Sequence, residues 1–168
     1  MTIRSTIRSS KTGGALIASL LAIAGGFAGV TVAEAADAPH HVQAAQLRAM
    51  VVTTKDGVIT APVPTGPGAT VLMVRRDRDG EVEVHEHLND EFVVQAGHAV
   101  VRVGGTVSGN RQTAPGERRG GTITDGSLYR LSPGDVLWIP AGQPHQTLVS
   151  KGGSFSYLAF KFEAKPAN

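Results

Sequence analysis

Three histidines and two neighbouring carboxylates are the side chains of this 168-residue sequence whose types and spacing could hold a metal ion. His85 and His87 are two residues apart, and on a β-strand such residues point to the same side, so both imidazoles could reach one point. Asp90 and Glu91 follow closely, and His145 would supply a third imidazole from a distant segment. Three imidazoles and one carboxylate suit Fe(II), Mn(II), Ni(II), Cu(II) or Zn(II) better than Ca or Mg. The pattern therefore predicts a divalent transition metal with a position left for water or a small-molecule ligand or substrate.

The segments that must position these side chains are short, apolar and separated by turn residues. Residues 81–87 (EVEVHEH) show the alternation typical of a strand. Val82 and Val84 would lie on one face, and Glu83, His85 and His87 on the other. Gly97 stands between two further apolar runs, which predicts a hairpin turn there. Residues 104–126 are polar and rich in Gly, Ser and Thr, which predicts a long loop or a ragged hairpin. Short strands at this spacing indicate an all-β sandwich or barrel.

Two segments resemble the paired motifs of the cupins. Residues 134–145 (GDVLWIPAGQPH) match the second cupin motif, G-x5-P-x-G-x2-H, through its histidine. Residues 80–97 (GEVEVHEHLNDEFVVQAG) more loosely resemble the first motif, which has a glycine, an HxH pair, an acid and a closing glycine. With the flanking strands the resemblance covers about residues 70–162, and it implies a small antiparallel β-barrel of jelly-roll type. The resemblance also implies that the three histidines named above hold a metal at the centre of the barrel.

Two neighbouring residues, Asp90 and Glu91, are candidates for the acidic ligand. The cupin motif usually has three or four residues between its second histidine and its Glu, and that Glu lies seven positions before the closing glycine. Glu91 fits the first count and lies six residues before Gly97, whereas Asp90 fits the second count but follows His87 after only two residues. We favour Asp90 slightly, because the strand that leads into the glycine fixes which side chains face inward. The motif also departs from the usual pattern in having four residues, not five, between its first glycine and the HxH pair.

Residues 1–35 have the three-part pattern of a secretory signal peptide. Arg4, Arg8 and Lys11 give a basic start, residues 15–32 are apolar, and residues 33–35 (AEA) form a small-x-small cleavage pattern. An uncleaved anchor is the alternative, because residues 15–33 carry no charge and approach the length that spans a bilayer. Glycines in this segment weaken a helix, so we expect cleavage, no stable membrane anchor afterwards, and a periplasmic or secreted protein.

The rest of the chain is expected to form one domain. Residues 36–66 would be an N-terminal arm with the first strand, and residues 42–52 within it could be a short helix or extended. Residues 67–163 would form the jelly-roll barrel, and residues 164–168 a tail. The resemblance to cupins also implies pairing into a homodimer through edge strands.

Composition excludes several classes of function. The chain has no cysteine, which excludes disulfides, thiolate metal sites and thiol nucleophiles. Basic and acidic residues balance once the first 35 residues are set aside, so the charge gives no argument for a nucleic-acid partner. Arg118 and Arg119 in the long polar segment could meet an anionic substrate, although a solvated pair is the favoured interpretation.

These observations predict a metal-dependent enzyme, an oxygenase, isomerase or lyase, that acts on a small organic molecule. Two alternatives stay open: a non-catalytic barrel that binds a small ligand, and a stable scaffold whose metal is structural or absent. The sequence offers no obvious general base outside the ligand set, and a fold shared by many functions cannot choose among them.

Overall fold

The computed structural model describes residues 39–165, and its strands confirm the all-β prediction. The predicted signal peptide, residues 1–35, and the last three residues of the predicted tail lie outside the described residues. The helical alternative for residues 42–52 is observed as α1 (Ala44–Met50). No helix between residues 39 and 165 is long and apolar enough to cross a membrane. The strands are β1 (Val58–Pro62), β2 (Thr70–Arg76), β3 (Glu83–His85), β4 (Leu88–Gly97), β5 (Ala99–Val103), β6 (Thr106–Ser108), β7 (Arg111–Ala114), β8 (Glu117–Arg119), β9 (Thr122–Thr124), β10 (Ser127–Leu131), β11 (Val136–Ile139), β12 (His145–Leu148) and β13 (Phe155–Glu163).

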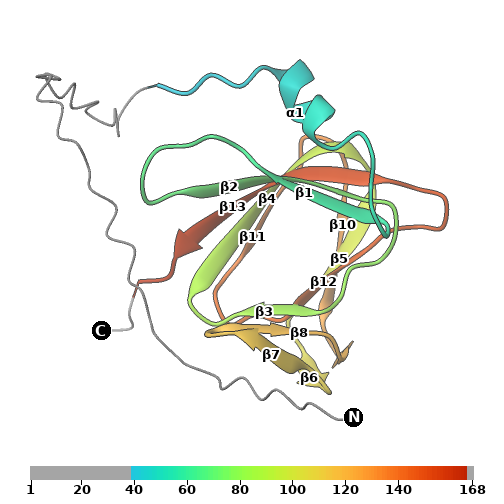
Figure 1. Ribbon diagram of the computed structural model, residues 1–168. Coiled ribbons are helices and arrows are strands. Elements are labelled where there is room, and N and C mark those ends of the chain that lie inside the picture. Colours follow the sequence, from blue (N-terminus) through green and yellow to red (C-terminus); the bar gives the residue numbers. More distant parts are fainter. Residues whose placement is uncertain (1–38, 166–168) are drawn as a thin grey trace, which may run out of the picture. The chain divides into compact units, whose positions relative to one another are not determined.

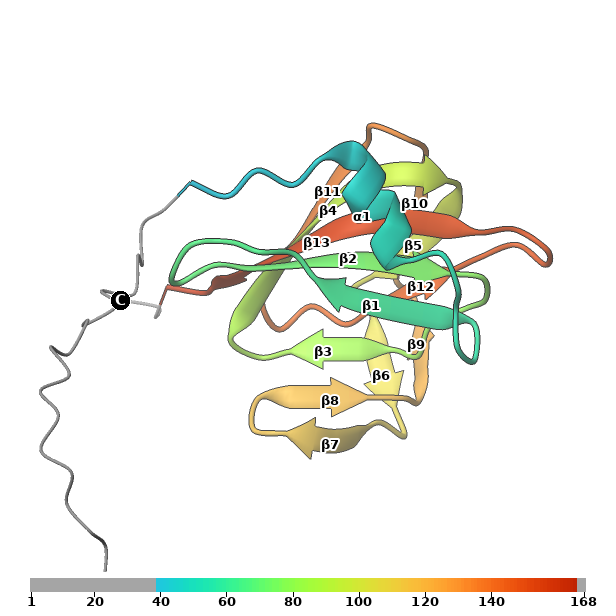
Figure 2. The ribbon, with the colours of Figure 1, turned by 45° about the horizontal axis from the view of Figure 1, so that its top comes forward.

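Two antiparallel sheets face each other and form the jelly roll that the sequence predicts (Figures 1 and 2). One sheet has the strand order β1-β2-β13-β4-β11, and the other has the order β10-β5-β12-β3-β8-β7. A separate two-stranded ladder joins β6 to β9. The first strand, which lies in the predicted N-terminal arm, pairs with β2 along its whole length.

The core lies between the two sheets and is built by alternation along the strands. In β4 the side chains of Asp90, Phe92 and Val94 are buried, while the residues between them face outward or are only half-buried. Strand residues two apart share a face, so one polar side chain is carried inward together with two apolar ones. The other inward-facing residues of the cluster are Val74, Ala99, Val101, Leu131, Leu137, Ile139, Val149, Phe155, Tyr157 and Ala159. The apolar layer therefore surrounds the position where polar side chains enter the barrel.

Gly97 does not form the predicted hairpin turn. The strands on either side of it, β4 and β5, belong to different sheets and do not pair with each other. The glycine instead marks the corner where the chain passes from one sheet to the other. It has a φ of 75°, in the left-handed region, and a Cβ at this position would overlap the carbonyl oxygen of Ser154. The hairpin prediction was wrong because a turn glycine looks the same in the sequence whether the next strand pairs locally or in another sheet.

We expect Gly97→Ala to lower the free energy of unfolding by about 2 kcal/mol, because the substitution combines left-handed strain with a backbone overlap. Urea unfolding of both proteins measures this difference. Gly66→Ala is the matched control, since a Cβ at Gly66 meets no atom within 4 Å and the residue has no positive φ. Equal losses in the two variants would contradict the role of the corner.

The predicted long loop at residues 104–126 is a ragged hairpin, the second of the two forms expected for it. Its outer part pairs β6 with β9, and its inner part pairs β7 with β8. Strand β8 also pairs with β3, where His85 lies opposite Glu117 and Glu83 lies opposite Arg119. The insertion therefore widens the second sheet and places two charged side chains beside the barrel interior.

Candidate metal centre

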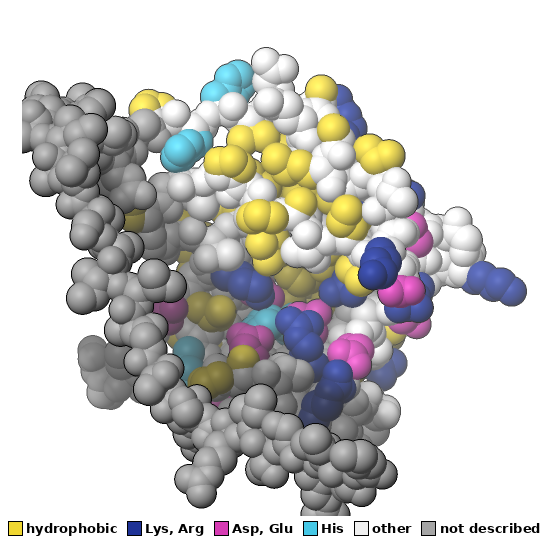
Figure 3. Space-filling view, viewed as in Figure 1, with side chains coloured by type: hydrophobic (Ala, Val, Ile, Leu, Met, Phe, Trp, Pro, Cys, Tyr) yellow, Lys and Arg dark blue, Asp and Glu magenta, His cyan; other side chains and the backbone are white. Residues whose placement is uncertain are grey.

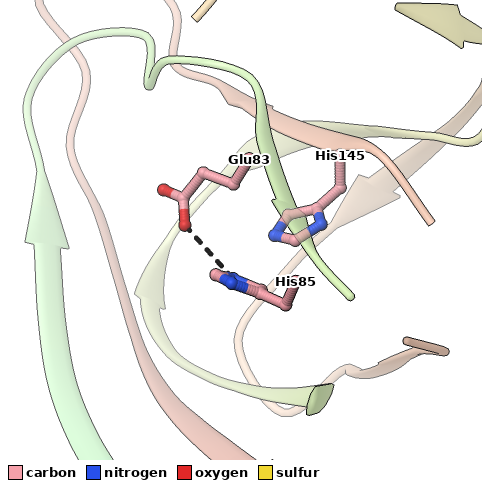
Figure 4. A group of neighbouring side chains, drawn as sticks. All are labelled: Glu83, His85 and His145. Atoms are coloured by element: carbon pink, nitrogen blue, oxygen red, sulfur yellow. Dashed lines mark ion pairs between the residues drawn. The ribbon is translucent and has the colours of Figure 1, made fainter. Parts of the chain in front are cut away.

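Four side chains from three strands converge between the sheets, and we call them the four-residue cluster: Glu83, His85, Asp90 and His145. His85 Nε2 lies 3.5 Å from Glu83 Oε2 and 3.3 Å from Asp90 Oδ2. His145 Nε2 lies 3.5 Å from the same oxygen of Asp90. Figure 4 shows Glu83, His85 and His145 pointing toward one another. The two histidines and the aspartate are buried, and Glu83 is half-buried.

Strand geometry explains the convergence. Glu83 and His85 are two residues apart on β3, so both face the same side. In the pairing of β12 with β3, His145 lies opposite Glu83, and directly opposite residues share a face. Asp90 approaches from the other sheet on the inward face of β4. A short strand, its neighbour in the sheet and one facing strand are therefore sufficient to bring the cluster together.

Both histidine rings are held by their Nδ1 atoms, which leaves their Nε2 atoms facing the cluster. His85 Nδ1 lies 2.5 Å from a carboxylate oxygen of Glu117, and His145 Nδ1 lies 3.2 Å from the carbonyl oxygen of Gln143. Because carboxylate and carbonyl oxygens only accept hydrogen bonds, each Nδ1 carries a proton and donates it. This arrangement, with one ring nitrogen donating outward and the other directed inward, is typical of histidines that bind metals.

The two carboxylates of the cluster, like the histidine rings, are each held by one atom while another atom faces the cluster. Glu83 Oε1 lies 3.0 Å from Arg76 Nη2 and 2.9 Å from Arg119 Nη1, while its other oxygen faces His85. Asp90 Oδ1 lies 2.6 Å from Lys161 Nζ, while its other oxygen faces both histidines. One oxygen of each acid is thus bound to a cation, and the second oxygen remains directed at the cluster.

The two histidines differ in pKa. Burial lowers the pKa of His85, but its hydrogen bonds with Asp90 and Glu83 outweigh burial and raise the pKa to about 9. Burial is the largest influence on His145 and holds its pKa below the usual value, despite the nearby carboxylates. Without a metal, the first imidazole is therefore protonated at neutral pH and the second is neutral. Among the described residues, His145 Nε2 is a buried nitrogen with no hydrogen-bond partner.

Both acids of the cluster are ionised. Burial raises the pKa of Glu83, but the hydrogen bond with His85 and the positive charge of Arg119 outweigh it and lower the pKa well below its usual value. For Asp90 burial again raises the pKa, and the hydrogen bond with His85 and the charge of Lys161 reverse the shift. The cluster therefore presents two carboxylates that need no further deprotonation to bind a cation.

The geometry and chemistry of the cluster fit a divalent transition metal. Two atoms that bind one such ion at about 2.1 Å lie roughly 3.0 to 3.4 Å apart, depending on coordination geometry. The ligand atoms of Glu83, His85 and His145 all lie within 4.8 Å of one another, and Asp90 Oδ2 lies 3.3 Å and 3.5 Å from the Nε2 atoms of the two histidines. Two imidazole nitrogens with two carboxylate oxygens form a donor set that suits Fe, Mn, Ni, Cu or Zn. The orphaned Nε2 of His145 would gain a partner in such an ion.

His87 lies apart from the four-residue cluster. Strand β3 ends at His85, and Glu86 and His87 form an exposed bend before β4 begins. The bend is fixed by a hydrogen bond from the N–H of Glu86 to the carbonyl of Gly116 and by one from the N–H of Ala164 to the carbonyl of His87. Strand alternation therefore does not extend to the second histidine of the HxH pair. The expectation that both imidazoles point to one place fails for this structural reason.

Glu91 also lies apart from the cluster, on the outer face of β4. It pairs with Trp138 of β11 and with Phe160 of β13, and the tryptophan is 49% exposed. Its neighbour Asp90 is 2% exposed and faces the interior. Of the five residues that the sequence nominates, the structure therefore brings together His85, Asp90 and His145.

Three polar residues at the site were missed by sequence reasoning: Glu83, Glu117 and Lys161. A signal for Glu83 was present in the spacing of the first motif. If the pair is read as Glu83 and His85, four residues lie between His85 and Asp90, and Asp90 lies seven positions before Gly97, so one acid satisfies both counts. No such local signal exists for Glu117 or Lys161, because each reaches the site through strand pairing across a long stretch of chain.

Comparisons with known proteins agree with this architecture. Residues 87–167 match the family model of the AraC-like ligand binding domain. A comparison with curated proteins found no match to this chain. Among solved structures, the chain is similar to an uncharacterized conserved protein with a double-stranded β-helix domain from Klebsiella pneumoniae, with 17% identity and a TM-score of 0.52 over 72% of this chain and 90% of that one.

Two further solved structures show the same likeness. TT1209 from Thermus thermophilus has 19% identity and a TM-score of 0.51, over 70% of this chain and 93% of its own. A proposed mannose-6-phosphate isomerase from Ralstonia eutropha has 19% identity and a TM-score of 0.51, over 75% of this chain and 100% of its own. At these identities the likeness concerns the fold, the double-stranded β-helix. That fold, and the match of residues 87–167 to the AraC-like domain model, agree with the resemblance of the sequence to the cupins.

Proposed function

We propose that the barrel binds a divalent transition metal through Glu83, His85, Asp90 and His145 and acts on a small organic molecule. The observation that carries this proposal is the orientation of the two imidazoles, each held at Nδ1 and each directing Nε2 at carboxylate oxygens in a buried space. Similarity to an AraC-like ligand binding domain supports a small-molecule ligand. The pattern of residues 1–35 supports a further proposal, that the protein is exported to the periplasm or beyond.

A bound metal would act as a Lewis acid that polarises an oxygen of the substrate. The chain supplies the surroundings for that chemistry. Phe92 packs edge-on against the ring of His145, with ring centroids 6.1 Å apart, and keeps this side of the cluster apolar. A cavity of about 120 Å³ borders Glu83, Asp90 and Lys161, and it is larger than the roughly 10–15 Å³ that one water needs. A small ligand therefore has room beside the cluster.

A metal-free binding barrel is the second candidate, and one observation favours it. Lys161 Nζ lies 2.6 Å from Asp90 Oδ1 and 3.1 Å from His85 Nε2, so an ammonium group already partly neutralises the cluster. Together with a protonated His85, and with Arg76 and Arg119 beside Glu83, it more than balances the charges of the two acids without an added cation. In that case the protein would hold a ligand and catalyse nothing through a metal.

Metal content separates the two candidates. We expect protein incubated with Fe(II), Mn(II), Ni(II), Cu(II) or Zn(II) and then dialysed to retain close to one equivalent of at least one of them, as measured by elemental analysis. His145→Ala should lower that occupancy by at least about 10-fold, because it removes a ligand and not merely a supporting residue. His98→Ala is the matched control, since His98 is exposed and its ring contacts Ser132 away from the cluster. Retention of no metal by the unaltered protein would instead support the metal-free barrel.

A further inference from the structure

The cavity beside the four-residue cluster has an unusual lining for the interior of a barrel. Its charged residues are three cations, Arg76, Arg119 and Lys161, and the two acids of the cluster. The remaining wall is largely apolar, with Leu72, Val74, Phe92 and Ala159 from the five-stranded sheet. Arg76 and Lys161 are largely buried, with side-chain exposures of 14% and 17%, and buried cations are costly unless they are paired, so the balance of cations and acids indicates what else binds there.

This inner cavity adjoins a larger outer one. The outer cavity has a volume of about 330 Å³ and shares Thr60, Arg76, Glu83 and Arg119 with the inner one. The side chain of Arg119 is 37% exposed, so it stands where solvent meets the interior. Figure 3 shows Lys, Arg, Asp and Glu side chains gathered on one part of the face below the yellow apolar surface, with a histidine visible between them. A charged molecule could therefore reach the cluster along a charged path.

We infer that the molecule bound beside the metal centre is a small organic carboxylate, an inference that rests on the proposed metal site. With a divalent ion at the cluster, Glu83 and Asp90 are shared between the ion and the three cations, and the lining has an excess of positive charge. An anion restores the balance. A guanidinium presents parallel N–H donors that match the two oxygens of a carboxylate, and Arg119 places its guanidinium at this cavity, with Nη1 2.9 Å from Glu83 Oε1. The apolar wall suits a carbon body, which an inorganic anion lacks.

The neighbouring arginine provides the contrast. Arg118 and Arg119 are adjacent on β8, so their side chains lie on opposite faces of the sheet. Arg118 donates hydrogen bonds to the side-chain oxygen of Asn110, at 3.1 Å and 3.3 Å, whereas Arg119 pairs with Glu83 of the cluster. The interpretation of the two arginines as a solvated pair therefore does not hold for Arg119, which lies at the mouth of the cavity.

Calorimetric titration of metal-loaded protein tests the inference, with acetate, lactate and malonate as probes and acetamide, lactamide and malonamide as their neutral counterparts. We expect at least one acid to bind at least 10-fold more tightly than its amide and than inorganic phosphate. Arg119→Gln should weaken binding of that acid by at least 10-fold, and Arg118→Gln should change it by less than 2-fold. Elemental analysis of each sample and thermal unfolding of each variant establish that metal and fold are retained.

The outcomes distinguish this inference from the proposal beneath it. Protein that retains no metal overturns the proposed function. Protein that retains metal overturns the carboxylate inference alone if none of the acids binds, if each acid binds no better than its amide, if phosphate binds as tightly, or if Arg118→Gln weakens binding as much as Arg119→Gln.

Discussion

Replacing Asp90 by Asn is expected to lower the affinity of the protein for its metal by more than about 100-fold, beyond the loss typical of residues that only support a ligand. The substitution removes a buried negative charge that faces both histidines and also pairs with Lys161. The Asn side chain is nearly isosteric, so the cavity keeps its shape while the electrostatic attraction for a cation is lost. Competition titration with a coloured chelator measures the affinity.

Glu91→Gln is the control for this experiment, because it makes the same chemical change one residue away on the outer face of β4. We expect it to leave metal affinity within about 2-fold, as for surface substitutions away from a site. A larger loss in Glu91→Gln than in Asp90→Asn would show that the acidic ligand comes from the other neighbour.

Glu83→Gln is expected to lower metal affinity by about 100-fold, the upper end of the range for supporting residues, and His87→Gln to leave it within about 2-fold. Glu83 Oε2 faces His85, and its other oxygen receives both arginines, so the variant loses a charged ligand and its orientation together. His87 is exposed in the bend after β3. The same chelator titration compares the variants, and thermal unfolding checks that each one folds. The reverse order of effects would mean that the HxH pair binds the metal and that the bend rearranges to allow it.

Much of the fold followed from local patterns in the sequence. Short apolar runs between turn residues were sufficient to predict an antiparallel sandwich or barrel, because each run buries one face by alternation, and the resemblance to the cupins implied the jelly roll. The sequence predicted that His145 brings a third imidazole to the barrel from a distant segment, and the structure places it, buried, as the first residue of β12. Where two interpretations were left open, at the segment before β1 and at residues 104–126, propensity alone could not decide between them.

The errors arose where strand ends and distant pairings decide the outcome. Alternation along EVEVHEH places Glu83, His85 and His87 on one face, but it cannot show that the strand ends after His85, which depends on hydrogen bonds to Gly116 and Ala164. Gly97 was assigned to a hairpin because the sequence does not show which sheet the next strand joins.

Lys161 shows the limit of local reasoning most clearly. It reaches the cluster because β13 pairs with β4 in a register that sets it opposite Asp90, 71 residues away in the chain. A single lysine near the end of an apolar run carries no local sign of this pairing. Only the long-range register, which the sequence does not display, makes it a neighbour of Asp90 and His85.

The docking of β8 against β3 has a thermodynamic consequence. The imidazole of His85 keeps its orientation through Glu117, and Glu117 keeps its place through the ladder that joins the two strands and through the hydrogen bond from the N–H of Gly120 to the carbonyl of Val82. Undocking of the inserted segment would release the ring that the segment orients. With the proposed metal at the cluster, its occupancy and the attachment of this segment would therefore be linked equilibria, and each would favour the other by the same free energy.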